Sequence, residues 1–201
     1  FAQVNAPLTP RLRAVASTRL DSISYSNLTR VEGVRATGQA TRTDAYSKPD
    51  LKTSNPSVGV VFQAAPAVTL KASAYRGFRA PTIAELVQPF RASGNVIGEG
   101  NPLLSPEYVT GVEGGLHFAS GGRRAAITGF WNSLSDPIIT VTLGLAGRST
   151  TIIAPCGAVP AGGACRQRQN LGRLRSEGLE VELQQRLGRT LLDASYLLNQ
   201  T

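Results

Sequence analysis

The sequence predicts an all-β fold, namely part of an antiparallel, up-and-down transmembrane β-barrel to which this chain contributes about eight strands. Apolar and polar residues alternate with a period of two in most segments, which is the spacing of a strand with one apolar face. Short turns and long loops alternate along the chain. The most apolar windows, SVGVVFQAA and PIITVTLGLA, are far shorter than the roughly 18 to 20 residues of a membrane helix, whereas a membrane strand needs only about 9 to 11.

The first two strands are predicted at residues 1–6 and 11–21, joined by a short turn at 7–10 that has a proline near each end. In the second strand the apolar face is formed by Leu12, Ala14, Ala16, Thr18 and Leu20, and the polar face by Arg11, Arg13, Ser17, Arg19 and Asp21. A helical period of 3.6 would mix these two sets. Residues 22–55 are polar, and we expect a long loop there, which is unusual in a compact soluble domain but common at one end of a membrane barrel.

The remaining strands are expected in pairs around short turns. The strands are 57–64 and 68–75 around a turn at 65–67, 108–118 and 124–143 around a turn at 119–123, and 169–187 and 192–198 around Gly188-Arg189. Long loops at 76–105 and 144–168 separate the pairs, so that all short turns lie at one end of the sheet. Pro137 is expected to mark a bulge or the membrane boundary, and Tyr108, Phe130 and Trp131 are candidates for an interfacial aromatic belt.

The loop at 76–105 and its flanks carry an ordered set of residues. Gly77-Phe78-Arg79-Ala80-Pro81 ends the strand before the loop, because Gly77 can adopt backbone angles forbidden to other residues and Pro81 holds Ala80 extended. Further members of the set follow in and after the loop: Glu85, Asn101, Pro102, Pro106, Glu107 and Glu113. We expect these residues to shape a strand-to-loop exit at the rim and to perform no chemistry.

This ordered set resembles a motif of the TonB-dependent outer-membrane receptor family, and the segment QNLGRLRSEGLEVEL resembles a late barrel strand of that family. The resemblance implies a plugged barrel of roughly 22 strands, with a plug domain and a TonB-interacting segment that this chain does not contain. Residues 1–201 would then be part of a single β-barrel domain. The chain begins at Phe1 and ends at Thr201 within strand-like segments, which also favours a fragment of a longer protein.

The resemblance also implies a function. Members of the family take up scarce ligands across the outer membrane of Gram-negative bacteria, most often iron-siderophore complexes and also haem, cobalamin, other metal chelates or saccharides. The implied partners are TonB, through the absent N-terminal region, an extracellular ligand such as a ferric siderophore, and outer-membrane lipid and lipopolysaccharide; no cofactor is implied. The alternative is a small, complete eight-stranded barrel that acts as an adhesin or structural anchor, because eight strands can close around side chains alone.

The basic charge balance favours an anionic partner. The chain carries 21 Lys plus Arg against 13 Asp plus Glu, a net charge of +8, and 18 of the basic residues are Arg. These arginines are scattered, without the basic helix or aromatic platform of nucleic-acid-binding modules, so we expect no nucleic-acid partner. Four of them lie in or beside long loops and are candidates for contacts with an acidic ligand or with lipid phosphates: Arg76, Arg79, Arg91 and Arg148.

Two further features bear on chemistry. Cys156 and Cys165 lie in one short Gly/Pro/Ala-rich loop and, with a single His in the chain, cannot complete a four-ligand zinc site. We expect a disulfide, with two free thiols as the alternative. His117 and Glu113 share the polar face of strand 108–118, either as a ligand-binding or proton-handling pair or as two solvated lumen side chains. No nucleophile motif, metal-binding His pair or phosphate loop is present, so we expect neither a metal site nor an enzyme.

Overall fold

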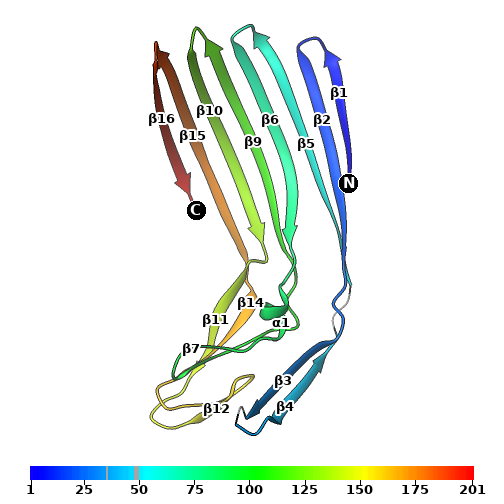
Figure 1. The fold of residues 1–201 in the computed structure, drawn as a ribbon, viewed down its shortest axis with the longest axis vertical. Coiled ribbons are helices and arrows are strands. Elements are labelled where there is room, and N and C mark those ends of the chain that lie inside the picture. Colours follow the sequence, from blue (N-terminus) through cyan, green and yellow to red (C-terminus); the bar gives the residue numbers. More distant parts are fainter. Residues whose placement is uncertain (35, 48–49) are drawn as a thin grey trace.

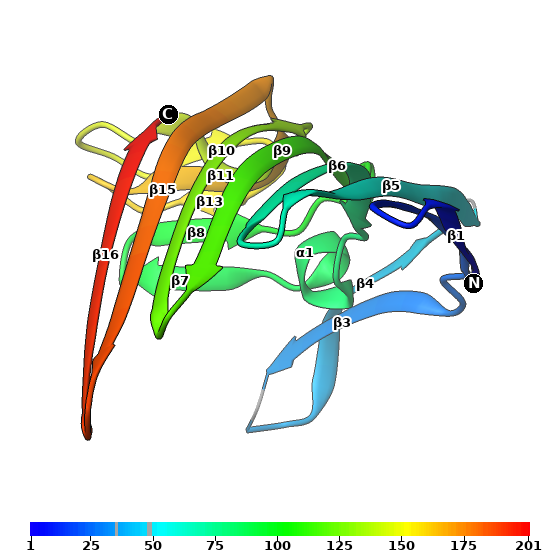
Figure 2. The ribbon, with the colours of Figure 1, turned by 90° about the horizontal axis from the view of Figure 1, so that it is seen from above.

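The computed structural model describes residues 1–34, 36–47 and 50–201, with the backbone but not the side chains of residues 91–93. Eight long strands form one curved antiparallel sheet of order β1-β2-β5-β6-β9-β10-β15-β16 (Figures 1 and 2). These strands are β1 (Ala2–Thr9), β2 (Leu12–Ile23), β5 (Leu51–Ala65), β6 (Val68–Arg79), β9 (Glu107–Ser120), β10 (Arg123–Ser135), β15 (Arg173–Leu187) and β16 (Thr190–Gln200). The prediction of an up-and-down antiparallel sheet of eight strands is therefore confirmed.

One face of the sheet is apolar and remains exposed. A single cross-strand row runs over seven strands as Leu12, Phe62, Leu70, Leu116, Ile127, Val181 and Tyr196, each residue directly opposite the next. Phe62 and Ile127 keep 40% and 47% of their surface exposed, so this row does not form a protein core. An exposed apolar band of this extent is what a barrel presents to lipid.

The short turns all lie at the same end of the sheet, at the top of Figure 1. Gly121, Gly122 and Gly188 have positive φ values of 55°, 78° and 60°, which tight hairpins require and which glycine adopts without strain. The polar segments at the opposite end, predicted as loops, form a layer of small strands and one helix, of which Figure 2 shows α1, β7 and β8 on the inner side of the arc. None of the helices in the described part of the chain is long and apolar enough to cross a membrane.

The long loops are more ordered than the sequence predicts. The segment 22–55 contains a hairpin, β3 (Leu28–Val34) with β4 (Gln39–Tyr46), and both β2 and β5 extend into it. The segment 76–105 contains helix α1 (Ile83–Val87) and strands β7 (Phe90–Ser93) and β8 (Val96–Glu99). The segment 144–168 contains β12 (Thr151–Ile153), β13 (Gly157–Val159) and most of β14 (Ala164–Asn170). These strands are short and carry few apolar residues, so the sequence gives little periodic signal for them.

The expected strand 124–143, with an interruption at Asp136-Pro137, consists of two strands in different sheets. Strand β10 ends at Ser135, Asp136 has φ 56°, and the chain then turns into β11 (Ile138–Leu145), which belongs to a second sheet of order β11-β14-β8-β7. The Asn170 side chain donates a hydrogen bond to the Asp136 carbonyl oxygen at 2.7 Å, and this holds the junction on the β14 side. Pro137 thus marks a change of sheet rather than a bulge, and its other predicted role, at the membrane boundary, stays a prediction.

The expected aromatic belt is only partly possible. Tyr108 and Trp131 share the apolar face of the sheet, because Tyr108 lies opposite Phe78 and Trp131 lies opposite Val112. Phe130 precedes Trp131 in the same strand and therefore points to the polar face, where its ring lies over Gly178. A belt could include Tyr108 and Trp131, but not Phe130.

Candidate ligand-binding site

The residues of the predicted motif meet at the junction between the sheet and the loop layer. The β6 ladder continues to Arg79, where Arg79 lies opposite Glu107, so the chain leaves the ladder at Ala80 and not at Gly77. The Arg79 guanidinium donates from Nε to Glu107 Oε2 at 2.6 Å and from Nη1 to Glu85 Oε2 at 2.9 Å. Glu107 Oε1 also accepts a hydrogen bond from the Ile138 backbone N–H at 2.5 Å. One arginine thus connects strands β6 and β9 with helix α1, and Glu107 connects them with β11.

Helix α1 is fixed by a capping box. The Thr82 hydroxyl accepts a hydrogen bond from the Glu85 N–H at 3.2 Å, and the Glu85 carboxylate accepts one from the Thr82 N–H at 2.8 Å. Burial acts most strongly on Glu85 and favours its neutral form, but the hydrogen bonds from Arg79 and Thr82 together outweigh it and lower the pKa of this carboxyl. The Glu85 side chain is therefore a charged partner of Arg79 at neutral pH.

The return of the chain after β8 packs tightly against this helix. A Cβ atom at Gly100 would lie 2.8 Å from the Leu86 carbonyl oxygen, so only glycine permits this approach. Asn101 follows: its N–H donates to the Glu85 carbonyl oxygen at 2.9 Å, and its side chain donates to the Arg168 carbonyl oxygen at 2.9 Å. Asn101 thereby ties two of the loop segments together. Pro102 and Pro106 lie in the turn and the extended stretch between Asn101 and β9.

The β3–β4 hairpin is docked onto this layer by apolar and ionic contacts. Leu28 is buried in a cluster with Leu86, Val87 and Leu104. Beside it the Arg30 guanidinium forms an ion pair with Glu99 of β8, and only 6% and 5% of these two side chains are exposed. Arg30 also pairs with Glu32 on its own strand. The hydrogen bond to the Glu99 carboxylate raises the pKa of Arg30, so the charge is retained despite burial.

A cavity of about 360 Å³ lies where these segments meet. Its lining comes from β3–β4, the α1–β7–β8 segment and the loop with the two cysteines: Arg30, Glu32, Arg42, Pro89, Phe90, Ile97, Glu99, Cys156 and Ala158. Arg42 is 40% exposed; its Nε pairs with Asp44 at 2.6 Å, and its Nη1 lies 4.0 Å from Glu99 Oε1. The Nε of Arg30 is buried and has no hydrogen-bond partner among the described residues.

The cavity offers both ionic and aromatic contacts. The Arg168 guanidinium lies 5.3 Å from the centre of the Phe90 ring, within the range of a cation–π contact. The two arginines in the lining can donate hydrogen bonds to ligand oxygens. The two glutamates can accept hydrogen bonds from ligand hydroxyl or amine groups. A polar, partly aromatic small molecule fits this chemistry. No group of three or more His, Cys, Asp or Glu residues that could bind a metal ion directly occurs in the described ranges.

Cys156 and Cys165 are joined by a disulfide in the structure. Cys165 is fully buried with Ile97, Ala146 and Val159, and Cys156 packs against this cluster and lines the cavity. The disulfide closes the segment that contains β13, so this wall of the cavity is covalently held.

The polar face of the sheet carries a second group of interacting residues. The Tyr75 hydroxyl lies 3.0 Å from Glu113 Oε1 and 2.9 Å from Asn132 Oδ1, and these three residues come from adjacent strands. A Cβ atom at Gly111 would lie 2.6 Å from the Tyr75 hydroxyl oxygen, so glycine provides the space for this contact. Glu113 is therefore held by Tyr75, and no interaction between Glu113 and His117 is present in the described part of the chain.

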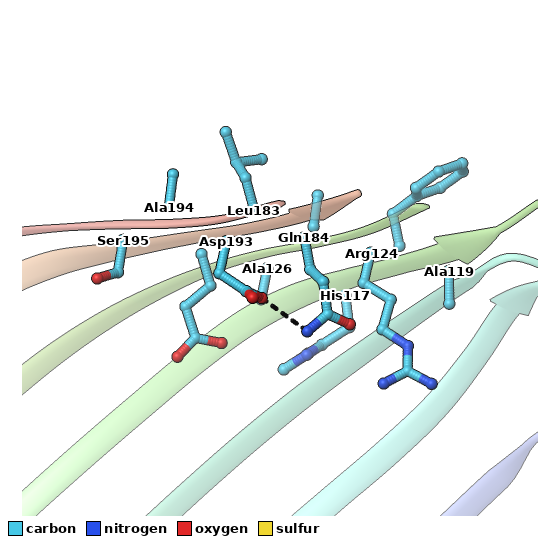
Figure 3. Close-up of a pocket in the computed structure, with 12 residues that line it drawn as sticks. His117, Ala119, Arg124, Ala126, Leu183, Gln184, Asp193, Ala194 and Ser195 are labelled. Carbon is cyan, nitrogen blue, oxygen red and sulfur yellow. Dashed lines mark hydrogen bonds between the residues drawn. The ribbon is translucent and has the colours of Figure 1, made fainter. Parts of the chain in front are cut away.

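His117 lies nearer the short turns, at a hollow of about 530 Å³ (Figure 3). His117, Arg124, Gln184 and Asp193 point to one side of the sheet, whereas Leu183 and Ala194 point to the other. Gln184 Nε2 donates to Asp193 Oδ1 at 2.7 Å. The hollow is open and wide, and the arrangement fits solvated polar side chains better than a proton-handling pair.

The four arginines proposed as anion contacts differ in their surroundings. Arg79 is occupied by two carboxylates, and Arg76 lies 4.3 Å above the ring of Tyr108. Arg148 is exposed in the loop after β11. The backbone of Arg91 lies in β7 opposite Ile97, and its side chain lies outside the described part. The structure thus brings none of the other three to the cavity.

Apart from Cys156, the residues that line the cavity are not indicated by the sequence. Arg30 and Arg42 fall in the segment expected to be a loop, and Phe90 and Glu99 fall in the motif loop. The alternation in LTRVEGV and QATRTDAY, with Gly38 between, is the signal that could have indicated a hairpin there. Arg30 and Glu99 are 69 residues apart in the sequence, so no local sequence pattern indicates that they pair.

Comparison with known proteins gives a consistent result. The family model described as TonB dependent receptor-like, beta-barrel matches residues 1–200. A search of curated protein sequences found no match. Among solved structures, the siderophore receptor PirA from Pseudomonas aeruginosa and the copper transporter OprC each show 20% sequence identity and a TM-score of 0.67 over 98% of this chain. A double mutant of the Serratia marcescens hemophore receptor HasR, in complex with its hemophore HasA and heme, shows 18% identity and a TM-score of 0.65 over 94% of this chain.

The match covers only a part of these proteins. The chain spans 33% of the PirA chain, 28% of the OprC chain and 31% of the HasR chain. At identities of 20% and below, the likeness concerns the fold.

Proposed function

Because the chain belongs to the TonB-dependent receptor family, whose barrel model matches residues 1–200, we propose that the complete protein is an outer-membrane transporter of a Gram-negative bacterium. Its ligand is a scarce metal complex, with an iron-siderophore complex as the leading candidate. Residues 1–201 form part of its single barrel domain, and the plug domain and the remaining strands lie in other parts of the protein. Uptake is driven through TonB, which contacts the protein outside this chain.

The observation that carries this proposal is the cavity between three loop segments at the end opposite the short turns. It combines Arg30, Arg42 and Glu99 with the ring of Phe90, and a metal chelate presents the matching oxygens and flat aromatic or amide groups. Solved structures of siderophore, heme-hemophore and copper receptors share the fold, which favours metal-containing ligands as a class. On this proposal the chain is a transport receptor and not an enzyme.

The exposed rim supplies a further contact. Arg148 lies on the surface of the loop layer, where it can contact an acidic ligand or the phosphates of lipopolysaccharide. Arg91 is a candidate for the same role by its position in β7. Arg76 and Arg79 are weaker candidates, because Tyr108, Glu85 and Glu107 already engage them.

The alternative of a small eight-stranded barrel gains no support from the sheet. Closure of such a barrel requires β1 to pair with β16, and the described strands place these two at opposite edges of the sheet (Figure 2). No observation favours an adhesin or an anchor.

The proposal is tested by deleting the complete gene and measuring growth on iron-limited medium supplemented with the iron-loaded culture supernatant of the same bacterium. We expect poorer growth of the deletion strain and its recovery when the complete gene is returned. A control supplement of a freely diffusing iron salt should restore both strains equally. Equal growth of both strains on the supernatant would remove the iron-chelate candidate.

A further inference from the structure

The end of the sheet opposite the loop layer carries a concentrated group of arginines. Arg123 and Arg124 begin β10, Arg186 precedes the end of β15, and Arg189 lies in the turn to β16. We call these four residues the arginine rim. The two hairpins are in direct contact, because the Arg186 N–H donates to the Gly122 carbonyl oxygen at 2.9 Å. The neighbouring turn between β5 and β6, Ala-Pro-Ala at 65–67, has no charge.

The charges of the arginine rim are not neutralised within the described residues. All four side chains are exposed, and none takes part in an ion pair in the ranges 1–34, 36–47 and 50–201. Arg123 Nε donates only to the neutral Gln185 side chain, at 3.0 Å. The nearest carboxylates in the sequence of these strands are Glu182 and Asp193, and Asp193 accepts from Gln184. At the loop end, by contrast, Arg30, Arg42 and Arg79 are all paired.

An apolar hollow adjoins the arginine rim on the apolar face. It has a volume of about 340 Å³. Its floor is the cross-strand row Phe118, Ala125, Leu183 and Ala194, and the next row toward the turns is Arg123, Gln185 and Leu192. Arg123 therefore places a positive charge at the side of the hollow nearest the short turns.

The apolar surface continues from this hollow toward the middle of the sheet. The next row on the same face is Leu116, Ile127, Val181 and Tyr196. From Ala125 to Gly129, at a rise of about 3.4 Å per residue, the apolar face of β10 extends over roughly 14 Å. This is about half the thickness of a hydrocarbon core. An acyl chain can lie along this surface while its head group remains beside Arg123.

We propose that Arg123 and Arg189 of the arginine rim, together with the adjoining hollow, form a binding site for an anionic phospholipid in the membrane leaflet that surrounds the short turns. The phosphate is bound by Arg123 and Arg189, since guanidinium groups bind phosphate oxygens in a bidentate manner, and the acyl chain occupies the hollow above Leu183. This site rests on the proposed function, because it requires the sheet to be part of a membrane barrel. It lies at the opposite end from the arginines that the sequence analysis singled out.

The site is tested with the complete protein in detergent, by native mass spectrometry after exposure to equal amounts of a phosphatidylglycerol and a phosphatidylcholine with the same acyl chains. The rim variant is Arg123→Gln with Arg189→Gln. The control variant is Arg11→Gln with Arg13→Gln, which removes the same charge at the same end of the sheet but beside a different hairpin. A third variant, Leu183→Asn, changes the hollow and leaves the arginines in place.

We expect the wild type and the control variant to retain phosphatidylglycerol in preference to phosphatidylcholine by about tenfold, which is the order expected for two arginines near a lipid phosphate. The rim variant should lose the preference, and Leu183→Asn should weaken retention of both lipids. Equal losses in the rim and control variants would show an effect of net charge and overturn the site. Displacement of the lipid by millimolar inorganic phosphate would show a phosphate site without an acyl-chain contact and would also overturn it.

Insertion into vesicles is checked first by the heat-dependent electrophoretic mobility of folded barrels. Failure of the wild type to insert would count against both the membrane transporter and the lipid site. Insertion without a lipid preference would remove the lipid site alone.

Discussion

Arg79 and Glu107 face each other across the last register pair of β6 and β9, with 2.6 Å between Nε and Oε2. The same guanidinium reaches Glu85 of α1, and the same carboxylate holds the N–H of Ile138 at the start of β11. The strand ends, the helix and the second sheet are therefore fixed by one connected group of side chains.

Replacement of Arg79 by Gln should loosen the loop layer without unfolding the large sheet. The Glu85 and Glu107 side chains are only 16% and 12% exposed, and both would lose a charged partner. We expect the free energy of local opening at residues 82–88 and 138–145 to fall by about 2 kcal/mol, the usual cost of leaving such a group unpaired. Hydrogen exchange of the complete protein measures this. Arg148→Gln, at an exposed arginine, is the control and should leave exchange unchanged; equal protection in both variants would contradict the role of Arg79.

The anchoring of α1 should depend on pH through Glu85. The folded-state pKa of Glu85 is lowered below its ordinary value of 4.5, so its contribution to stability is complete above about pH 4.5 and is lost as the pH falls through the lower folded value. Protection factors for residues 82–88, corrected for intrinsic exchange, should therefore decrease in acid. In Glu85→Gln they should be lower at neutral pH and should change less on acidification. An unchanged acid decrease in the variant would assign it to another group.

The Arg30–Glu99 pair should hold the β3–β4 hairpin in place. Glu99→Ala leaves the buried Arg30 charge with Glu32 as its remaining carboxylate, and it should lower the free energy of hairpin opening by about 3 kcal/mol, the lower end of the cost of breaking a buried pair. The double variant Arg30→Met with Glu99→Leu keeps the volume and removes both charges, so its hairpin should open much less readily than that of Glu99→Ala. Hydrogen exchange of β3 and β4 distinguishes the two. Equal opening in both variants would show that the ion pair does not secure the hairpin.

Gly111 should be far less replaceable than Gly114. A Cβ atom at Gly111 meets Asn132 Oδ1 at 2.3 Å and the Tyr75 ring and hydroxyl at 2.5 and 2.6 Å, whereas at Gly114 the nearest atom is 4.0 Å away. Gly111→Ala should therefore lower the free energy of unfolding by about 1 to 3 kcal/mol, and Gly114→Ala should have little effect. Denaturant unfolding of the reconstituted complete protein gives both values. A similar loss in both would mean that the Tyr75 contact is not the cause.

The large sheet could be predicted from the sequence because each of its strands has one apolar face. The row from Leu12 to Tyr196 follows directly from a period of two, and the hairpin glycines mark the turns. Pro137 marks an interruption after β10, but the change to a second sheet there could not be predicted, because it depends on the long-range pairing of β11 with β14. The β3–β4 hairpin leaves only a weak alternation around Gly38. The strand end at Arg79, rather than at Tyr75, depends on the pairing of Gly77 and Phe78 with β9.

The cavity could not be predicted from the sequence, for a different reason. Its walls come from three segments whose order in space is set by long-range contacts such as Arg30 with Glu99 and Asn101 with Arg168. The cysteine pair was recognisable because its two members are nine residues apart in one loop. The role of Arg79 as a structural connection could not be separated from a ligand contact without the positions of Glu85 and Glu107.

The central claim, that the complete protein is a TonB-dependent transporter of an iron chelate, is tested most directly by uptake of radioactive iron. The iron is added to the iron-limited culture supernatant of the source bacterium, and cells that express the complete gene are compared with and without a functional TonB. We expect accumulation of iron well above that of cells without the gene, and its loss when TonB is absent. Accumulation that is the same in all three kinds of cell would contradict the claim.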